Sequence, residues 1–152
     1  MSTETLVNPA EQFRATIERS IEIDASPEAI FESILEDMQS IPGSDGKTMN
    51  LKLEPFPGGR WFRDLGNNTG HLWGHVQVIK PPTLIEVYGP LMISSAAISH
   101  VTWRIKPQGD VHRLTITHKL FGDFDPSIPQ NVGGGWQMVI DRIKAAAMKK
   151  KH

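Results

Sequence analysis

The C-terminal third of the chain constrains the fold most, because it joins a strand, a loop and a long amphipathic helix. Apolar side chains recur at every second residue from Leu114 to Leu120, which is the period of a half-buried strand. His118 falls on the same face as these side chains, so one imidazole interrupts an otherwise apolar row. After a turn-rich loop, Gly133-Gly134-Gly135-Trp136 is predicted to open a helix of roughly twenty residues.

The spacing of apolar residues predicts which side of this last helix is buried. The stripe consists of Trp136, Val139, Ile140, Ile143 and Ala147. Asp141, Lys144 and Lys149 fall on the polar side. A helix with one apolar stripe needs a sheet to pack on, so the rest of the chain should supply one.

The preceding residues read as one short helix within a series of strands. Ser26-Pro27-Glu28 is typical of a helix start, because serine caps the first amides and proline at the first position loses no hydrogen bond. Pro42 and the glycines around it predict that this helix ends near Leu35 and that residues 36–47 form a loop, a candidate pocket entrance. Strands are predicted at residues 15–24, 49–54, 60–65, 72–79, 84–88, 96–105 and 111–120.

This order of elements predicts an α+β helix-grip fold. About seven antiparallel strands form a curved sheet that wraps around the long C-terminal helix, with a cavity between them. Residues 13–152 are expected to form a single domain after a flexible N-terminal tail at residues 1–12.

Charge and composition exclude several classes of function. A net charge of -1 gives no basic face for nucleic acid. The absence of cysteine excludes disulfides and thiolate chemistry. No segment reads as a signal peptide or a membrane span, so a cytoplasmic location is expected.

Short motifs along the chain occur together in one known family. They are Ile21-Glu22-Ile23-Asp24-Ala25-Ser26-Pro27, Pro57-Gly58-Gly59-Arg60-Trp61, Gly74-His75-Val76 with Pro81-Pro82, Val101-Thr102-Trp103-Arg104-Ile105, Leu114-Thr115-Ile116-Thr117-His118 and Gly135-Trp136. In this order they resemble the activator of Hsp90 ATPase homologue branch of the START/Bet v 1-like (SRPBCC) superfamily, over residues 15–148. The resemblance implies a Bet v 1-like fold around a hydrophobic pocket. The chain departs from the family pattern after Leu35, where a second helix would be short or absent.

Residues on the inner faces of the predicted elements are the candidate ligand contacts. They are His118, Trp103, Trp136, Val101, Ile116, Ile140, Tyr88 and Phe31. For the two tryptophans, packing in the core and lining of the pocket are both open. For His118, the alternatives are a polar group that faces a ligand and a histidine hydrogen-bonded within the core. Arg19 and Glu86 either anchor a ligand, or extend their charged ends to solvent or pair at strand edges.

The strand at residues 72–79 raises a separate question of orientation. Leu72, Gly74, Val76 and Val78 are predicted to face inward. His71, Trp73 and His75 would then face outward, and an exposed Trp73 would be either part of a dimer surface or an isolated surface aromatic. The two histidines would be about 13 Å apart, too far to share a metal ion.

Three functions from different classes remain open. The first is binding of a small hydrophobic or amphipathic molecule. The second is a cyclase, dehydratase or hydrolase that uses His118 as acid or base, although the chain lacks the known catalytic motifs. The third, implied only by the resemblance, is association with an Hsp90-type chaperone. No catalytic residue, metal or cofactor is assigned, Gly133-Gly134-Gly135 lacks the lysine of a phosphate-binding loop, and a homodimer is an open expectation.

Overall fold

The computed structural model describes residues 13–150, so the predicted tail at residues 1–12 lies outside the described part of the chain. The elements are β1 (Phe13–Ile23), α1 (Pro27–Ser40), β2 (Leu51–Leu53), β3 (Arg60–Gly66), β4 (Thr69–Lys80), β5 (Leu84–Gly89), β6 (Ala97–Gln108), β7 (Val111–Gly122) and α2 (Ile128–Lys150). The strands form a seven-stranded sheet in the order β1-β7-β6-β5-β4-β3-β2, and every neighbouring pair is antiparallel.

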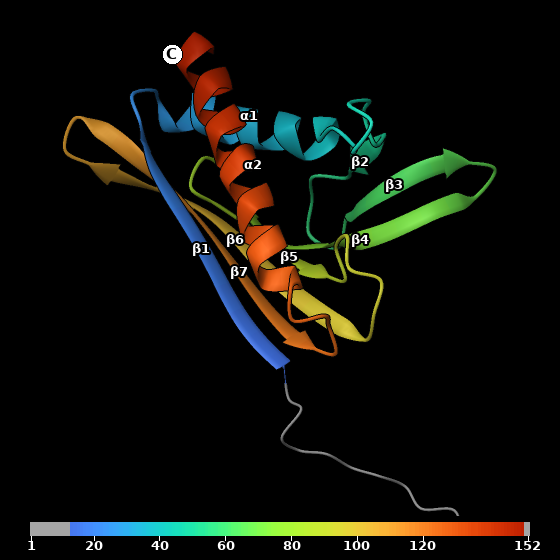
Figure 1. Ribbon diagram of the computed structural model, residues 1–152. Helices are drawn as coiled ribbons and strands as arrows, with labels where there is room; N and C mark the ends of the chain where they lie inside the picture. The colour runs from blue at the N-terminus through green and yellow to red at the C-terminus, as the bar shows by residue number, and fades with distance from the viewer. Residues whose placement is uncertain (1–12, 151–152) are drawn as a thin grey trace, which may run out of the picture.

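Two helices cover one face of this curved sheet. Figure 1 shows α2 running diagonally across the sheet, while α1 lies against the C-terminal half of α2. The predicted α+β helix-grip fold is therefore confirmed. Within residues 13–150, neither helix is long and apolar enough to cross a membrane.

Burial of the apolar stripe holds α2 on the sheet. All five predicted stripe residues, Trp136, Val139, Ile140, Ile143 and Ala147, are buried. They pack on inward-facing side chains of β1, β6 and β7, among them Ile17, Val101 and Ile116. Each fully buried aliphatic side chain contributes roughly 1.5–3 kcal/mol, so this stripe is a large part of the core.

The first helix begins as predicted and ends later than predicted. The side chain of Ser26 accepts a hydrogen bond from the amide of Ala29 at 3.1 Å, so Ser26 is the N-cap. The helix then continues past Leu35 to Ser40, because Met38 is buried in the core and stabilises the last turn. Within residues 41–50 the chain forms no second helix, only a loop closed by one bridge between Pro42 and Thr48.

The second helix starts earlier than the glycine run suggests. It begins at Ile128, so Gly133–Gly135 lie inside its second turn and do not open it. The start follows a local turn in which the Asp125 carboxylate accepts a hydrogen bond from the amide of Ser127 at 2.8 Å. Proline in the first turn of a helix is tolerated, so Pro129 does not prevent this earlier start.

Around Trp73, side chains of β4 do not alternate between the two faces of the sheet as predicted. Trp61 pairs with Gly74, but the next residue, Phe62, pairs with Leu72, so Trp73 is an extra residue in β4. Such a β-bulge reverses which residues face the core. Trp73 is accordingly only 4% exposed, whereas Leu72 is 47% exposed. The predictions that Trp73 faces outward and Leu72 inward are both wrong, and Trp73 cannot contribute an exposed ring to a dimer surface.

A second register shift in β4 lies between Val76 and Val78. Val76 is buried as predicted, but Val78 pairs with Glu86 and shares its side of the sheet, because directly opposed residues in a ladder share a face. His75 lies on the outer side as predicted, where its ring is 5.9 Å from that of Tyr88. Residues 74–76, between the two bulges, therefore keep the predicted orientation, whereas Leu72, Trp73 and Val78 outside them are inverted.

The buried face of α2 can be tested with neighbouring substitutions. Ile143 is fully buried, so Ile143→Asp places an unpaired charge in the core and should lower the free energy of unfolding by more than about 3 kcal/mol. Lys144→Asp, one residue along the helix, should cost less than about 1 kcal/mol. Urea unfolding followed by circular dichroism measures both, and equal losses would contradict the assigned face.

Candidate functional site

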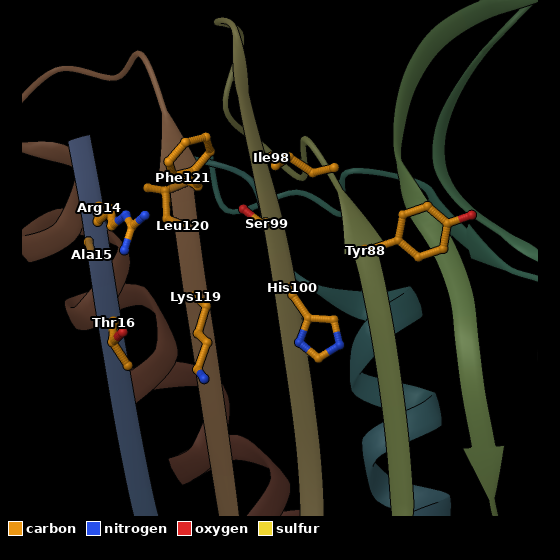
Figure 2. Close-up of a pocket in the computed structure, with 10 residues that line it drawn as sticks. All are labelled: Arg14, Ala15, Thr16, Tyr88, Ile98, Ser99, His100, Lys119, Leu120 and Phe121. Atoms are coloured by element: carbon orange, nitrogen blue, oxygen red, sulfur yellow. The ribbon is translucent and has the colours of Figure 1, made fainter. Parts of the chain in front are cut away.

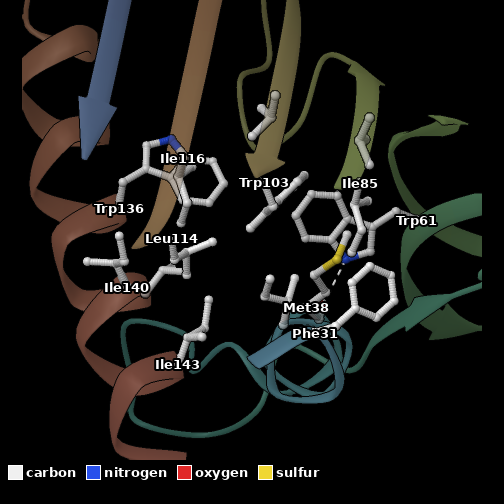
Figure 3. Packing of buried hydrophobic residues seen from close by; sticks show 14 of the residues in the cluster. Phe31, Met38, Trp61, Ile85, Trp103, Leu114, Ile116, Trp136, Ile140 and Ile143 are labelled. Atoms are coloured by element: carbon white, nitrogen blue, oxygen red, sulfur yellow. Dashed lines mark hydrogen bonds between the residues drawn. The ribbon is translucent and has the colours of Figure 1, made fainter. Parts of the chain in front are cut away.

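The four tryptophans of the chain form one continuous cluster under α2. The ring centroids are 5.0 Å apart for Trp73–Trp61, 6.0 Å for Trp61–Trp103 and 5.7 Å for Trp103–Trp136. All three pairs are edge-to-face, the arrangement that aromatic quadrupoles favour. Figure 3 shows Trp136 on α2, Trp103 in the centre and Trp61 beside α1. The cluster thus links α2 to three strands of the sheet.

Hydrogen bonds fix two rings of the cluster, those of Trp61 and Trp136. The indole N–H of Trp61 donates to the carbonyl of Met38 at 2.8 Å, which satisfies one carbonyl in the last turn of α1 (Figure 3). The indole N–H of Trp136 donates to Nδ1 of His118 at 2.9 Å. Between them, Nε1 of Trp103 is buried without a hydrogen-bond partner, and its ring faces two neighbouring indoles.

His118 is a hydrogen-bonded core residue. It is fully buried, and its Nε2 lies 2.7 Å from Oγ of Ser99. Because Nδ1 accepts from Trp136, Nε2 carries the proton and donates to the serine hydroxyl. Burial lowers the pKa of His118 from 6.5 to about 4, so the ring is neutral at pH 7. Of the two interpretations of His118, the geometry supports the histidine hydrogen-bonded within the core.

An apolar pocket of about 420 Å³ opens beside this cluster. Trp61, Trp73 and Trp136 form its inner wall, α2 forms one side, and the loop that follows α1 forms the other. The full lining is Ile41, Pro42, Gly43, Ser44, Met49, Trp61, Trp73, Met92, Ile93, Ile128, Asn131, Val132, Gly135, Trp136, Met138, Val139 and Arg142. The α2 residues recur every three or four positions from Ile128 to Arg142, which extends the groove for about 21 Å along the helix.

One charged side chain reaches this pocket. Nε of Arg142 donates to Oδ1 of Asp37 at 2.9 Å, and the Nη2 group donates to Oδ2 at 3.3 Å. Asp37 lies in the last turn of α1 and is nearly buried, so this pair also ties α1 to α2. Burial raises the pKa of the Asp37 carboxyl, and the hydrogen bonds from Arg142 oppose that shift.

The structure places the eight predicted contact residues in three different environments. Trp136 lines the pocket. His118, Trp103, Val101, Ile116, Ile140 and Phe31 are buried in the core behind it. Tyr88 is 41% exposed and lies on the opposite face of the sheet. The centre of the fold, where the ligand cavity was expected, is therefore filled by side chains.

The opposite face of the sheet carries a second hollow, of about 440 Å³. Figure 2 shows it over β1, β7, β6 and β5, with both helices behind the sheet. Its large apolar side chains, Tyr88, Ile98 and Phe121, are between 41% and 53% exposed. These side chains remain open to water, whereas the indoles that form the inner wall of the pocket beside α2 are at most 4% exposed.

Arg19 and Glu86, the two charged residues at apolar positions of the predicted strands, do not line the pocket. The guanidinium of Arg19 donates to the carbonyl of Glu18 at 2.9 Å and lies beneath Gly133, where an added Cβ would come within 2.8 Å of it. Glu86 accepts a hydrogen bond from His100 at 3.0 Å. Glu86 thus pairs with a neighbouring strand, whereas Arg19 bonds the backbone of its own strand.

Several pocket residues were missed from the sequence. Trp73 was assigned to the wrong face, and Met49, Met92 and Met138 had no recognisable signal because they come from three separate elements. Arg142 had a signal, since it lies three residues after Val139 and seven after Gly135 on the same helix.

A curved antiparallel sheet gripping a long C-terminal helix, with an apolar pocket beside the helix, defines the helix-grip or Bet v 1-like class of proteins. Residues 24–148 match the family described as activator of Hsp90 ATPase homolog 1-like protein, and the chain belongs to this family. The resemblance noted in the sequence is therefore confirmed. Proteins of this fold family commonly bind hydrophobic ligands.

Solved structures share the fold at low sequence identity. A protein from Rhizobium leguminosarum superposes with a TM-score of 0.70 at 15% identity, covering 91% of this chain and 97% of that one. The Aha1 dimer from Colwellia psychrerythraea gives 0.64 at 15% identity, covering 91% and 99%. Ara h 8.0201 gives 0.64 at 11% identity, covering 90% and 99%. Among curated protein sequences, none matches this chain.

The neutral state of His118 should make stability depend on pH. The unfolded chain binds a proton at this residue below pH 6.5, whereas the folded chain does so only near pH 4, so the stabilisation present at pH 7 is lost as pH falls through this window. Between pH 7 and pH 5 this residue alone should remove about 2 kcal/mol of unfolding free energy.

The control for this pH effect is His118→Gln, because the amide can still donate and accept but does not titrate. Urea unfolding of both proteins at pH 7 and pH 5 should show a smaller loss for the variant. Identical losses would mean that His118 is not held neutral by burial.

Proposed function

We propose that this protein binds a small hydrophobic or amphipathic molecule in the pocket between α2, the loop at residues 41–49 and the tryptophan cluster. The observation that carries the proposal is the combination of an apolar space of about 420 Å³ with an inner wall of three indole rings that are already held in place. A wall that does not rearrange on binding lowers the entropic cost of association.

The rim of the pocket, unlike its rigid aromatic wall, consists of flexible side chains. Met92 is 50% exposed and Met138 is 61% exposed, and both lie at its edge together with Met49. Unbranched thioether side chains adapt to ligands of different outline, and sulfur contacts aromatic edges favourably. A rigid aromatic wall with an adaptable methionine rim supports binding of a flat apolar body rather than a flexible polar one.

Glycines on α2 offer a matched test of this proposal. Gly135 lines the pocket and Gly134 does not, and an added Cβ meets no atom within 4 Å at either position. Gly135→Leu should therefore fill the pocket, whereas Gly134→Leu should leave it open, while both changes raise helix propensity by about 1 kcal/mol.

The measurement is native mass spectrometry of the freshly purified proteins, followed by tryptophan emission titrations with a neutral probe such as 2-acetylnaphthalene. The parent protein and Gly134→Leu should carry or bind the small molecule, and Gly135→Leu should bind at least about tenfold more weakly. Equal binding by the two leucine variants, or no binding by the parent protein, would remove the proposal.

Two partner proposals come from the family and its structural relatives. The Colwellia relative is described as a dimer, and the family is named for activation of Hsp90 ATPase. For this chain we propose a homodimer from the structural relative and association with an Hsp90-type chaperone from the family. Sedimentation equilibrium of the protein alone, and sedimentation velocity with a purified Hsp90, would detect each complex directly.

A further inference from the structure

The polar groups of the pocket indicate which head group its ligand carries. Arg142 is the charged residue among those that line the pocket, and Asn131 and Ser44 are the other polar side chains there. The lining contains no carboxylate. The guanidinium of Arg142 can only donate, whereas Asn131 and Ser44 can donate or accept, so this lining favours a ligand with an acceptor.

The charge of Arg142 is already compensated inside the protein. Asp37 takes two of its donor groups through Nε and Nη2, at 2.9 and 3.3 Å. The side chain of Asp37 is only 9% exposed, and that of Arg142 is 33% exposed, so water screens this pair weakly. What remains for a ligand is three of the five guanidinium N–H donors, two on Nη1 and one on Nη2, in an ion pair whose two charges cancel.

An anionic head group would meet an unfavourable field at this position. A ligand carboxylate bound to Nη1 would lie near the carboxylate of Asp37, and two carboxylates that share one guanidinium in a half-buried site repel each other. A ketone, amide or lactone oxygen accepts the same hydrogen bonds without that repulsion and loses less hydration on entering the pocket.

The geometry points to a neutral, flat, conjugated carbonyl compound as the ligand of this pocket, with its oxygen on Arg142 and its ring system against Trp61, Trp73 and Trp136. This inference rests on the proposed ligand-binding function and adds the class of ligand. The three indoles favour an aromatic body, because offset and edge-to-face ring contacts contribute beyond the area buried.

A pair of probes with one ring system and two head groups tests the inference. 2-Acetylnaphthalene carries a neutral ketone, whereas 2-naphthoate carries a carboxylate of similar size. Equilibrium dialysis at pH 7.5, with each compound measured by its absorbance, gives both affinities without relying on protein emission. The parent protein should bind the ketone at least about tenfold more tightly than the carboxylate.

Asp37→Asn is the variant that isolates the role of charge. It keeps a hydrogen-bond acceptor for Arg142 but removes the compensating negative charge, so the affinity for 2-naphthoate should rise at least about tenfold while that for the ketone changes little. Lys149→Asn is the matched control, because Lys149 lies on the same helix outside this pocket and should leave both affinities unchanged.

The outcomes separate the inference from the proposed function. Tighter binding of 2-naphthoate by the parent protein would overturn the neutral head group and leave ligand binding intact. No binding of either probe would overturn both. If Asp37→Asn unfolds, the ratio of the two affinities in the parent protein alone still decides the question.

Discussion

The edge-to-face contacts among the four tryptophans are the constraint on which the rest of this structure depends. They connect α2 through Trp136 to β6, and through Trp61 and Trp73 to the far strands of the sheet. Because Trp61 also donates to the carbonyl of Met38, the same cluster sets where α1 ends. Rigid rings in contact leave little freedom in the separation of helix and sheet, so the width of the pocket follows from the core itself.

Side chains fill the space between α2 and the centre of the sheet, and the pocket lies beside this packed core. His118, which could have presented a polar group to a ligand, instead has both ring nitrogens engaged by Trp136 and Ser99. A buried polar residue of this kind is stable only when its partners are in place, so it favours one arrangement of the core over others. The space for a ligand lies where side chains of α2 and the loop after α1 meet only in part.

Regular periodicity explains what could be predicted here, and local irregularity explains what could not. The apolar stripe of α2 and the Ser26 cap depend on spacing within a few residues, so the sequence reveals them. The face of Trp73 depends on a one-residue insertion in the ladder with β3, which leaves no mark in the alternation of β4. The pocket joins residues from five separated segments, and only Trp136 among them was expected to contact a ligand.

The paired bulges in β4 have an evolutionary consequence. Between them residues 74–76 have one phase of alternation, and the residues on either side, Trp73 among them, have the opposite phase, so the first bulge shifts the alternation and the second restores it. Loss of one residue at the bulge beside β3 would exchange the ring at the pocket wall for a neighbouring side chain, while the long pairings of β1, β6 and β7 stay the same. Among relatives of this chain, differences in the length of this strand should therefore change ligand preference as effectively as substitutions do.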